Sequence, residues 1–203
     1  MPDSFTVLNV CTGNLCRSPL AASVLAQRFA DISEIRLHSA GTRAALGRPV
    51  PREAREIAGF MGAIDIRTHR ARQVSEEMLS GSDVVLAMTR EHRRVLVELN
   101  PRIVRRAFTI RELASLAALT TDEEIIRQGA LPTADRVTRL RAAVEAAARR
   151  RSHRRSQDRP ADDVIDPFGC DREIYALAAL QLAPAIEGVA VLFQRALNLG
   201  DGR

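Results

Sequence analysis

The sequence predicts an α/β fold: a three-layer, doubly wound sandwich in which a four-stranded parallel sheet carries helices on both faces. Strand-like and helix-like segments alternate along most of the 203 residues, as expected when right-handed helical crossovers join parallel strands. Residues 83–88 contain the apolar run Val-Val-Leu-Ala-Met, which is typical of a strand buried on both faces. The length suits one domain spanning residues 1–203.

Local patterns predict each element in turn. Apolar residues at helical spacing, from Leu20 to Phe29, predict a helix over residues 18–30. The helix over residues 90–99 should end at Asn100, because Pro101 restricts the backbone of the residue before it. A long amphipathic helix over residues 172–197 should pack on the sheet and close the fold. The remaining expected elements are strands at residues 5–10, 35–38, 83–88 and 106–110, a turn at 39–42, and helices at 51–61, 75–79 and 111–119.

Residues 120–160 interrupt the alternation and are interpreted as an Arg-rich insertion within the domain, helical or disordered. A helix is expected over residues 133–151, with Val137, Leu140 and Val144 on one face. From residue 136 to residue 159 there are nine arginines but only two acids, Glu145 and Asp158. This segment therefore has a net charge of +7. Because the net charge of the whole chain is only +5, the rest of the chain is slightly acidic.

Composition excludes several classes of function. All 30 basic residues are arginine, and the sequence contains no lysine. This excludes a Walker-type phosphate loop and a Schiff-base mechanism, because both require a lysine amine. The three cysteines are an odd number without zinc-ligand spacing, which favours a reducing cytoplasm and no metal or cofactor. We expect no apolar run of membrane-spanning length and no signal pattern, and therefore a cytoplasmic protein without membrane association.

The most informative segment is residues 11–19, Cys-Thr-Gly-Asn-Leu-Cys-Arg-Ser-Pro, which follows an apolar strand and precedes a helix. Such a loop forms a nest of backbone N–H groups, and the helix adds its positive end. This environment favours the thiolate of Cys11. Arg17 supplies a planar fork for two phosphate oxygens. The segment therefore predicts nucleophilic attack on a bound oxyanion, phosphate first among candidates.

The composition of the loop supports this interpretation. Gly13 and Asn14 tolerate the left-handed backbone that a tight cradle requires. Ser18 is expected to cap the helix, with Pro19 at its first position.

Together these residues resemble the low-molecular-weight protein tyrosine phosphatases, in the bacterial branch. Four further segments recur in that family in the same order: Ser-Ala-Gly-Thr at 39–42, His-Arg-Ala-Arg at 69–72, residues 83–88, and Asp-Pro-Phe-Gly at 166–169. The resemblance covers about residues 5–113 and 162–198 and fails over about 114–161. Gly169 and Cys170 stand where animal members often have a tyrosine pair.

The resemblance implies a role for each matched residue and requires no metal or cofactor. Cys11 is the nucleophile that forms a phosphocysteine. Asp166 is the general acid for the leaving group and then the base for water, and Pro167 stiffens its loop. Neighbouring acids, Asp162 and Asp163, help a partly desolvated carboxyl to hold a proton. The phosphate-binding residues are Thr12, Gly13, Asn14, Leu15, Cys16 and Arg17. The supporting residues are Asn14, Ser18, Ser39, His69 and Pro167.

The substrate class follows from one position in the loop. Some bacterial relatives hydrolyse phosphoarginine and have a small polar Thr at the position of Leu15. An apolar Leu15 suits an aryl ring, which favours phosphotyrosine proteins or peptides as substrates. Residues 43–46 lack the aromatic wall common in the family, leaving Phe168 as the aromatic surface. A phosphoarginine phosphatase remains an alternative.

Two other functions are weighed against this one. A thioredoxin-coupled arsenate reductase shares the fold but needs further cysteines to relay a disulfide. Met88 and Thr89 stand where such relatives have a resolving pair, and Cys170 alone is weak support. The Arg run at residues 149–155 also suits an acidic or nucleic-acid partner, but no aromatic residues interleave with it, so nucleic acid is not expected.

The sequence leaves two roles open for Cys16. It could form a reversible disulfide that shields Cys11 from over-oxidation, or it could be an inert buried thiol. The sequence leaves the oligomeric state open.

Overall fold

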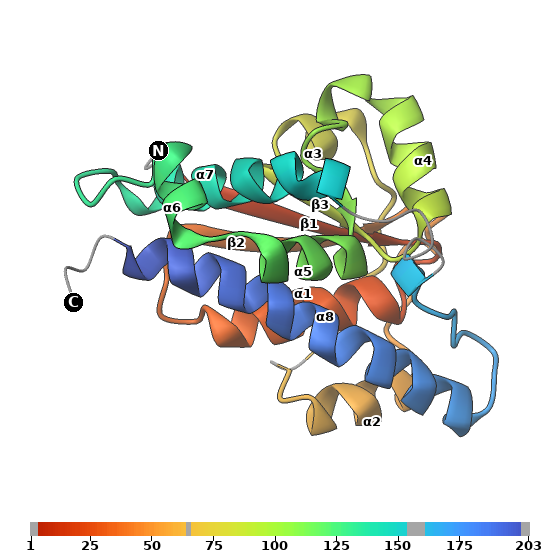
Figure 1. The fold of residues 1–203 in the computed structure, drawn as a ribbon. Coiled ribbons are helices and arrows are strands. Elements are labelled where there is room, and N and C mark those ends of the chain that lie inside the picture. Colours follow the sequence, from red (N-terminus) through yellow and green to blue (C-terminus); the bar gives the residue numbers. More distant parts are fainter. Residues whose placement is uncertain (1–3, 64–65, 154–160, 200–203) are drawn as a thin grey trace.

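The computed structural model describes residues 4–63, 66–153 and 161–199, and a four-stranded parallel sheet lies at its centre (Figure 1). The strands are β1 (Phe5–Cys11), β2 (Ile35–Gly41), β3 (Val84–Ala87) and β4 (Ala107–Thr109), in the spatial order β2-β1-β3-β4. The register pairs Cys11 with Gly41 on one side of β1 and Val10 with Ala87 on the other. The predicted α/β class and four-stranded parallel sheet are confirmed.

Alternate residues of each strand feed two separate apolar clusters, one on each face of the sheet. In β1, Phe5 and Val7 belong to the larger cluster, whereas Leu8 and Val10 belong to the smaller one. This follows from the two-residue period of a strand, and it explains why β3 is apolar throughout. Both faces of the sheet are therefore covered.

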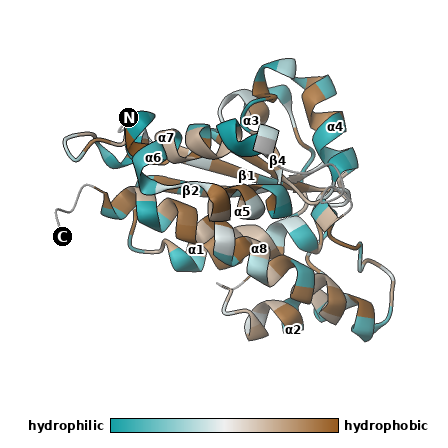
Figure 2. Cartoon of the chain, in the orientation of Figure 1, coloured by the Kyte–Doolittle hydropathy of each residue, from teal (hydrophilic) through white to brown (hydrophobic). Residues whose placement is uncertain are grey.

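The larger cluster is covered by α1 (Arg17–Arg28), α5 (Ile110–Leu119), α7 (Arg136–Arg149) and α8 (Arg172–Asn198). The opposite face is covered by α3 (Glu76–Ser80), α4 (Arg90–Leu99) and η1 (Pro101–Ile103). Figure 1 shows α8 between α5 and α1, and Figure 2 shows that much of α8 is apolar. The short helix α2 (Arg52–Phe60) packs against α8 and α1.

Several local predictions are corrected. Residues 39–41 continue β2 instead of forming a turn. Helix α1 begins at Arg17 with Cys16 as its N-cap residue, and no side chain caps it. The Ser18 hydroxyl instead forms hydrogen bonds inside the loop, where it accepts from Asn14 Nδ2 and lies 3.0 Å from Cys11 Sγ. Two further elements, η1 and α6 (Asp122–Arg127), were not among those predicted, although Thr121 and Glu124 form a capping box that marks the start of α6.

The segment 120–160 contributes α6, α7 and the short η2 (Arg150–His153), and residues 154–160 lie outside the described part. The helix is shorter than the predicted 133–151. The face of α7 carrying Val137, Leu140 and Val144 is buried in the main cluster against α8 and α5. Several arginines here bind carboxylates of this same chain, including Arg141 to Asp83, Arg150 to Glu124 and Arg151 to Glu112.

Among the described residues, α8 is the one helix long and apolar enough to span a membrane by length and composition. This corrects the expectation that no apolar run reaches that length. Buried helices at the centre of a core meet the same criterion, and α8 has such a position. Ile186, Val189 and Phe193 are buried in the main cluster, and the Phe193 ring packs edge-on against Phe5 of β1, with the ring centroids 5.2 Å apart.

Candidate active site

The loop that follows β1 is held in shape by the amide side chain of Asn14. Its Nδ2 donates to Ser18 Oγ and Ser39 Oγ, each at 3.0 Å, and its Oδ1 accepts from the backbone N–H of Arg72 at 2.9 Å. His69 Nε2 lies 2.8 Å from the Asn14 carbonyl oxygen. The structure thus brings together Asn14, Ser18, Ser39 and His69, whereas the fifth predicted supporting residue, Pro167, takes no part in these hydrogen bonds.

Backbone geometry explains why asparagine stands in the loop. Asn14 has a φ of 54°, and it is the only non-glycine residue with a positive φ in the described part of the chain. Asparagine tolerates this left-handed conformation better than most residues. Gly13 tolerates the same conformation but does not adopt it in this loop.

Cys11 ends β1 at the base of the loop, and its side chain is buried. Its Sγ lies 3.0 Å from the hydroxyl oxygen of Ser18. That oxygen accepts from Asn14 Nδ2, and its own proton has two acceptors within reach, Cys11 Sγ and the Ala40 carbonyl oxygen at 3.3 Å.

Arg17 joins this loop to the segment that carries Asp166. The guanidinium is 4% exposed; Nη1 donates to the Val164 carbonyl at 2.9 Å, and Nη2 forms an ion pair with Asp166. Its Nε is also buried but has no hydrogen-bond partner among the described residues. A buried N–H without a partner is costly, and a phosphoryl oxygen would satisfy it. Asp166 itself stays about half exposed.

A pocket of about 250 Å³ opens above Cys11. Leu15, Ala45 and Phe168 give it apolar surface, while Arg43 and Arg48 add positive charge. Its described lining consists of Cys11, Thr12, Gly13, Leu15, Cys16, Arg17, Arg43, Ala45, Arg48, Asp166 and Phe168. Five of the six predicted phosphate-binding residues line it; the sixth, Asn14, has its fully buried side chain in the supporting network.

The neighbouring acids are arranged differently from the expectation. Asp163 is bonded to Arg90, whose backbone N–H donates at 2.7 Å and whose Nη2 donates at 2.9 Å. Burial raises the pKa of Asp163, but the hydrogen bonds and charge of Arg90 lower it by more. The pKa of Asp163 is therefore below its usual value. Asp162 is buried and has a partner of its own. Of the three acids, Asp166 alone lines the pocket above Cys11, whereas Asp163 faces an adjoining cavity.

Sequence reasoning missed a histidine that contacts the loop from the other side of the sheet. His92 in α4 places Nε2 2.8 Å from Thr12 Oγ1, and its Nδ1 lies 2.9 Å from Thr89 Oγ1. Burial, followed by the charge of Arg17, lowers the pKa of His92 to about 4. The neutral ring is therefore the form that holds Thr12. No sequence signal links positions 12 and 92, because the contact exists only once β1 and β3 pair.

The three cysteines have different environments. Cys16 is buried with its Sγ 3.8 Å from the Tyr175 hydroxyl, and burial raises its pKa to about 12, so it stays a thiol. Cys170 is exposed, beyond the Asp166 turn. Cys11, Cys16 and Cys170 are all free.

Residues 6–125 match the family model described as low molecular weight phosphotyrosine protein phosphatase. The chain belongs to this family. The predicted membership is confirmed, and with it the hydrolase class. The match covers the Cys11 loop, Ser39, His69 and His92, while Asp166 and Pro167 lie beyond it.

Individual relatives and solved structures agree with the family. A probable low molecular weight protein-tyrosine-phosphatase of Ralstonia nicotianae is 35% identical to this chain, in an alignment that covers 53% of this chain and 72% of the relative. A protein-arginine-phosphatase of Geobacillus stearothermophilus is 33% identical, in an alignment that covers 55% of this chain and 72% of the relative. A crystal structure of a low molecular weight protein tyrosine phosphatase from T. tengcongensis superposes with a TM-score of 0.63 at 30% identity, covering 91% of this chain and 97% of that one. The arginine phosphatase YwlE of G. stearothermophilus superposes with a TM-score of 0.64 at 26% identity, covering 94% and 93%.

Proposed function

We propose that this protein is a cysteine-dependent tyrosine phosphatase that hydrolyses phosphotyrosine or other aryl phosphomonoesters through a phosphocysteine intermediate. The observation that carries the proposal is the shared pocket: a buried thiol, a buried guanidinium with an unused donor and a half-exposed carboxyl line one cavity with an apolar wall. Each group supplies one requirement of phosphoryl transfer, namely attack, charge stabilisation and proton transfer.

In the first step the Cys11 thiolate attacks phosphorus. An S–P bond forms while the P–O bond to the phenolic oxygen breaks, and Asp166 donates its proton to that departing oxygen. Arg17 and the backbone N–H groups of residues 12–17 stabilise the charge on the three transferred oxygens. Because Asp166 pairs with Arg17 in the free protein, the incoming phosphoryl oxygens must displace it, which frees the carboxyl to carry a proton.

In the second step Asp166 accepts a proton from water as the water oxygen attacks phosphorus. The S–P bond breaks, inorganic phosphate leaves, and the Cys11 thiolate is restored. Each step inverts the configuration at phosphorus. No metal or cofactor takes part in either step.

The pocket lining favours an aryl leaving group over a guanidinium. Leu15, Ala45 and Phe168 offer apolar contact to a ring. A phosphoarginine side chain would bring its guanidinium nitrogens beside Arg43 and Arg48, and Asp166 is the one carboxylate in the described lining. Like charges in such a mouth disfavour that substrate.

The test is hydrolysis of p-nitrophenyl phosphate in EDTA by the full chain and two variants. Cys11→Ser should have no detectable activity, because serine lacks the thiolate. Asp166→Asn keeps the shape of the side chain but carries no proton to give, so kcat should fall by about 10²–10⁴-fold. A phosphoarginine peptide at the same concentration should be hydrolysed far more slowly than a phosphotyrosine peptide.

Activity that survives in Cys11→Ser would overturn the mechanism. Preference for phosphoarginine would overturn the substrate class and leave the mechanism standing. Arsenate reduction with thioredoxin, in the absence of phosphatase activity, would favour the reductase alternative. The intermediate is checked directly by rapid acid quench of Asp166→Asn, which should trap phosphate on Cys11.

The proposed location is the cytoplasm, where reducing conditions keep Cys11 in its thiol or thiolate form. The proposed partners are phosphotyrosine proteins or peptides, without nucleic acid or membrane.

A further inference from the structure

Two arginines at the mouth of the pocket have fixed backbones. Residues 42–51 connect β2 to α2, and backbone hydrogen bonds tie the first of them to the Cys11 loop. The Arg43 N–H donates to the Thr12 carbonyl at 3.0 Å, and the Ala45 N–H donates to the Gly13 carbonyl at 3.1 Å. The Arg48 N–H then donates to the Ala45 carbonyl at 3.0 Å. Arg43 and Arg48 therefore start from defined positions beside the phosphate cradle.

The side chains of these two residues are exposed and have no hydrogen-bond or ion-pair partner in the described part of the chain. Their situation differs from that of other arginines close to the site. Arg17 pairs with Asp166, Arg90 pairs with Asp163, and Arg72 Nε donates to the Ser39 carbonyl at 2.8 Å. The guanidiniums of Arg43 and Arg48, called the rim arginines below, are thus available to a ligand that enters the pocket.

The charge of the mouth has a consistent sign. In the described lining Asp166 is the one carboxylate, and it is already paired with Arg17. Arg43 and Arg48 therefore leave the mouth positive before substrate arrives. The phosphoryl group is bound deeper, by Arg17 and the loop amides, so the rim arginines serve other negative groups of the substrate. Guanidinium forks bind carboxylates in two-point contacts.

We propose that Arg43 and Arg48 select phosphotyrosine segments with Asp or Glu close to the phosphotyrosine. This inference rests on the proposed tyrosine phosphatase function and adds the class of protein substrate. The ring lies between Leu15, Ala45 and Phe168, and the flanking carboxylates bind the two rim guanidiniums. Charge complementarity of this kind raises the association rate and discriminates against neutral or basic segments.

The experiment compares two phosphotyrosine peptides that differ only in their flanks, one with Asp and Glu and the other with Asn and Gln. The readout is the ratio of kcat/KM for the acidic peptide to kcat/KM for the neutral one. The full chain should favour the acidic peptide, and Arg43→Gln combined with Arg48→Gln should lower the ratio about five- to tenfold. Rising salt should lower the ratio of the full chain as well.

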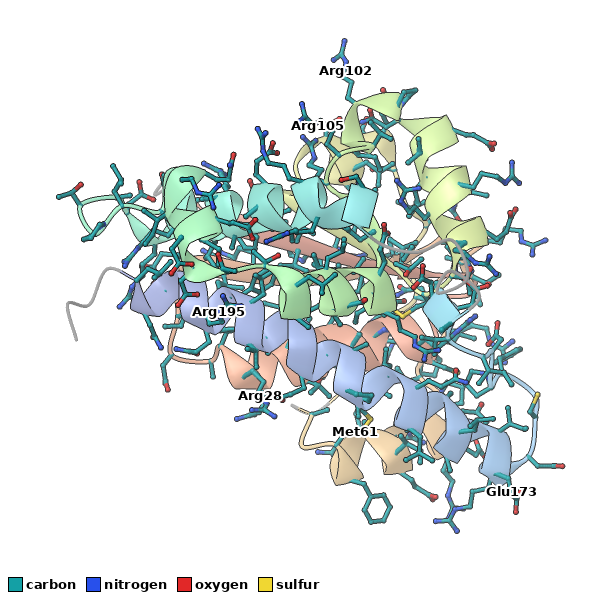
Figure 3. All side chains as sticks on the ribbon, viewed as in Figure 1. Arg28, Met61, Arg102, Arg105, Glu173 and Arg195 are labelled. Carbon is teal, nitrogen blue, oxygen red and sulfur yellow. The ribbon has the colours of Figure 1, made fainter. Side chains whose placement is uncertain are left out.

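Arg102→Gln is the matched control, because Arg102 in η1 is exposed and extends away from the rest of the molecule (Figure 3). Combined with Arg105→Gln, which is also at an exposed position, it removes the same two charges as the rim variant and should leave the ratio unchanged. A ratio near one for the full chain, or an equal fall in the control, would overturn the proposal. So would an equal loss on both peptides in the rim variant.

Binding separates this proposal from the proposed activity. The Cys11→Ser variant is mixed with each labelled peptide, and affinity is measured by fluorescence anisotropy. Selective loss of acidic-peptide affinity on adding the two rim substitutions supports the rim proposal even where the full chain hydrolyses no aryl phosphate. Equal affinities for the two peptides reject it, whatever the activity.

Discussion

At the scale of single residues, the site depends on close approach between the end of β2 and the Cys11 loop. A Cβ on Gly41 would lie 2.4 Å from the Thr12 carbonyl oxygen and 3.0 Å from the Asn14 nitrogen, both backbone atoms that a side chain cannot push aside cheaply. Glycine at position 41 therefore allows the loop to sit against the sheet. This requirement is steric, because Gly41 does not have a positive φ.

We expect Gly41→Ala to displace the loop and to lower kcat/KM for p-nitrophenyl phosphate about 10²-fold, since a shift of about 1 Å suffices for such a loss. The unfolding free energy should fall by about 1–3 kcal/mol from overpacking. Steady-state kinetics and urea denaturation measure the two effects.

Gly59→Ala is the control, because nothing lies within 4 Å of its Cβ position in α2. It should keep full activity and gain up to about 1 kcal/mol, the helix preference of Ala over Gly. Full activity in Gly41→Ala would show that this contact does not set the loop.

The residues that sequence could identify are those whose chemistry forms a local pattern. Cys11 and Arg17 lie in one short segment, and Asn14 stands where a left-handed residue is needed. His92 could not be found in this way, because its contact with Thr12 joins positions 80 residues apart and arises from strand pairing. The position of the Ser18 hydroxyl was misjudged for a related reason: inside the loop, tertiary partners outweigh the local capping preference.

At the scale of elements, α7 is the clearest difference between sequence and structure. The break in alternation at residues 120–160 predicts an Arg-rich insertion within the domain, helical or disordered. The fold, however, gives α7 a buried side against α8 and α5, which no local pattern identifies as their partner. The Arg139 side chain is itself buried and donates to the Leu197 carbonyl at 2.9 Å.

Leu140→Ala should therefore destabilise the protein by about 2–4 kcal/mol, the cost of a cavity at a fully buried site. Urea denaturation followed by circular dichroism measures the loss. Arg149→Ala, at an exposed position paired with Glu145, should change stability by less than about 0.5 kcal/mol.

Deletion of residues 120–158 should abolish folding for the same reason, since the deletion removes α6 and α7 together. A loss below 1 kcal/mol in Leu140→Ala, or a folded deletion variant, would mean that this segment is separate from the cooperative core.

At the scale of the whole molecule, the site lies where the strand order changes direction. From β1 the chain pairs first with β2 on one side and then with β3 on the other, and the loops after β1 and β3 diverge to opposite faces of the sheet. Ligands of open parallel sheets bind at such points. The Cys11 loop follows β1, and Thr89 and His92 follow β3, so the same topology that predicts the site also brings a neutral histidine against its loop.

That histidine makes stability depend on pH. Burial lowers the pKa of both His69 and His92, the latter to about 4, against 6.5 for the free side chain. Between about pH 6.5 and pH 4 these histidines therefore bind protons in the unfolded chain but stay neutral in the folded protein. The unfolding free energy falls as the pH falls through that window. For His92 alone the loss at pH 5 is about 2 kcal/mol. Urea denaturation at pH 7.5 and pH 5 measures it, and His92→Gln should shrink the difference between the two pH values. An equal difference in His92→Gln would place the titrating groups elsewhere.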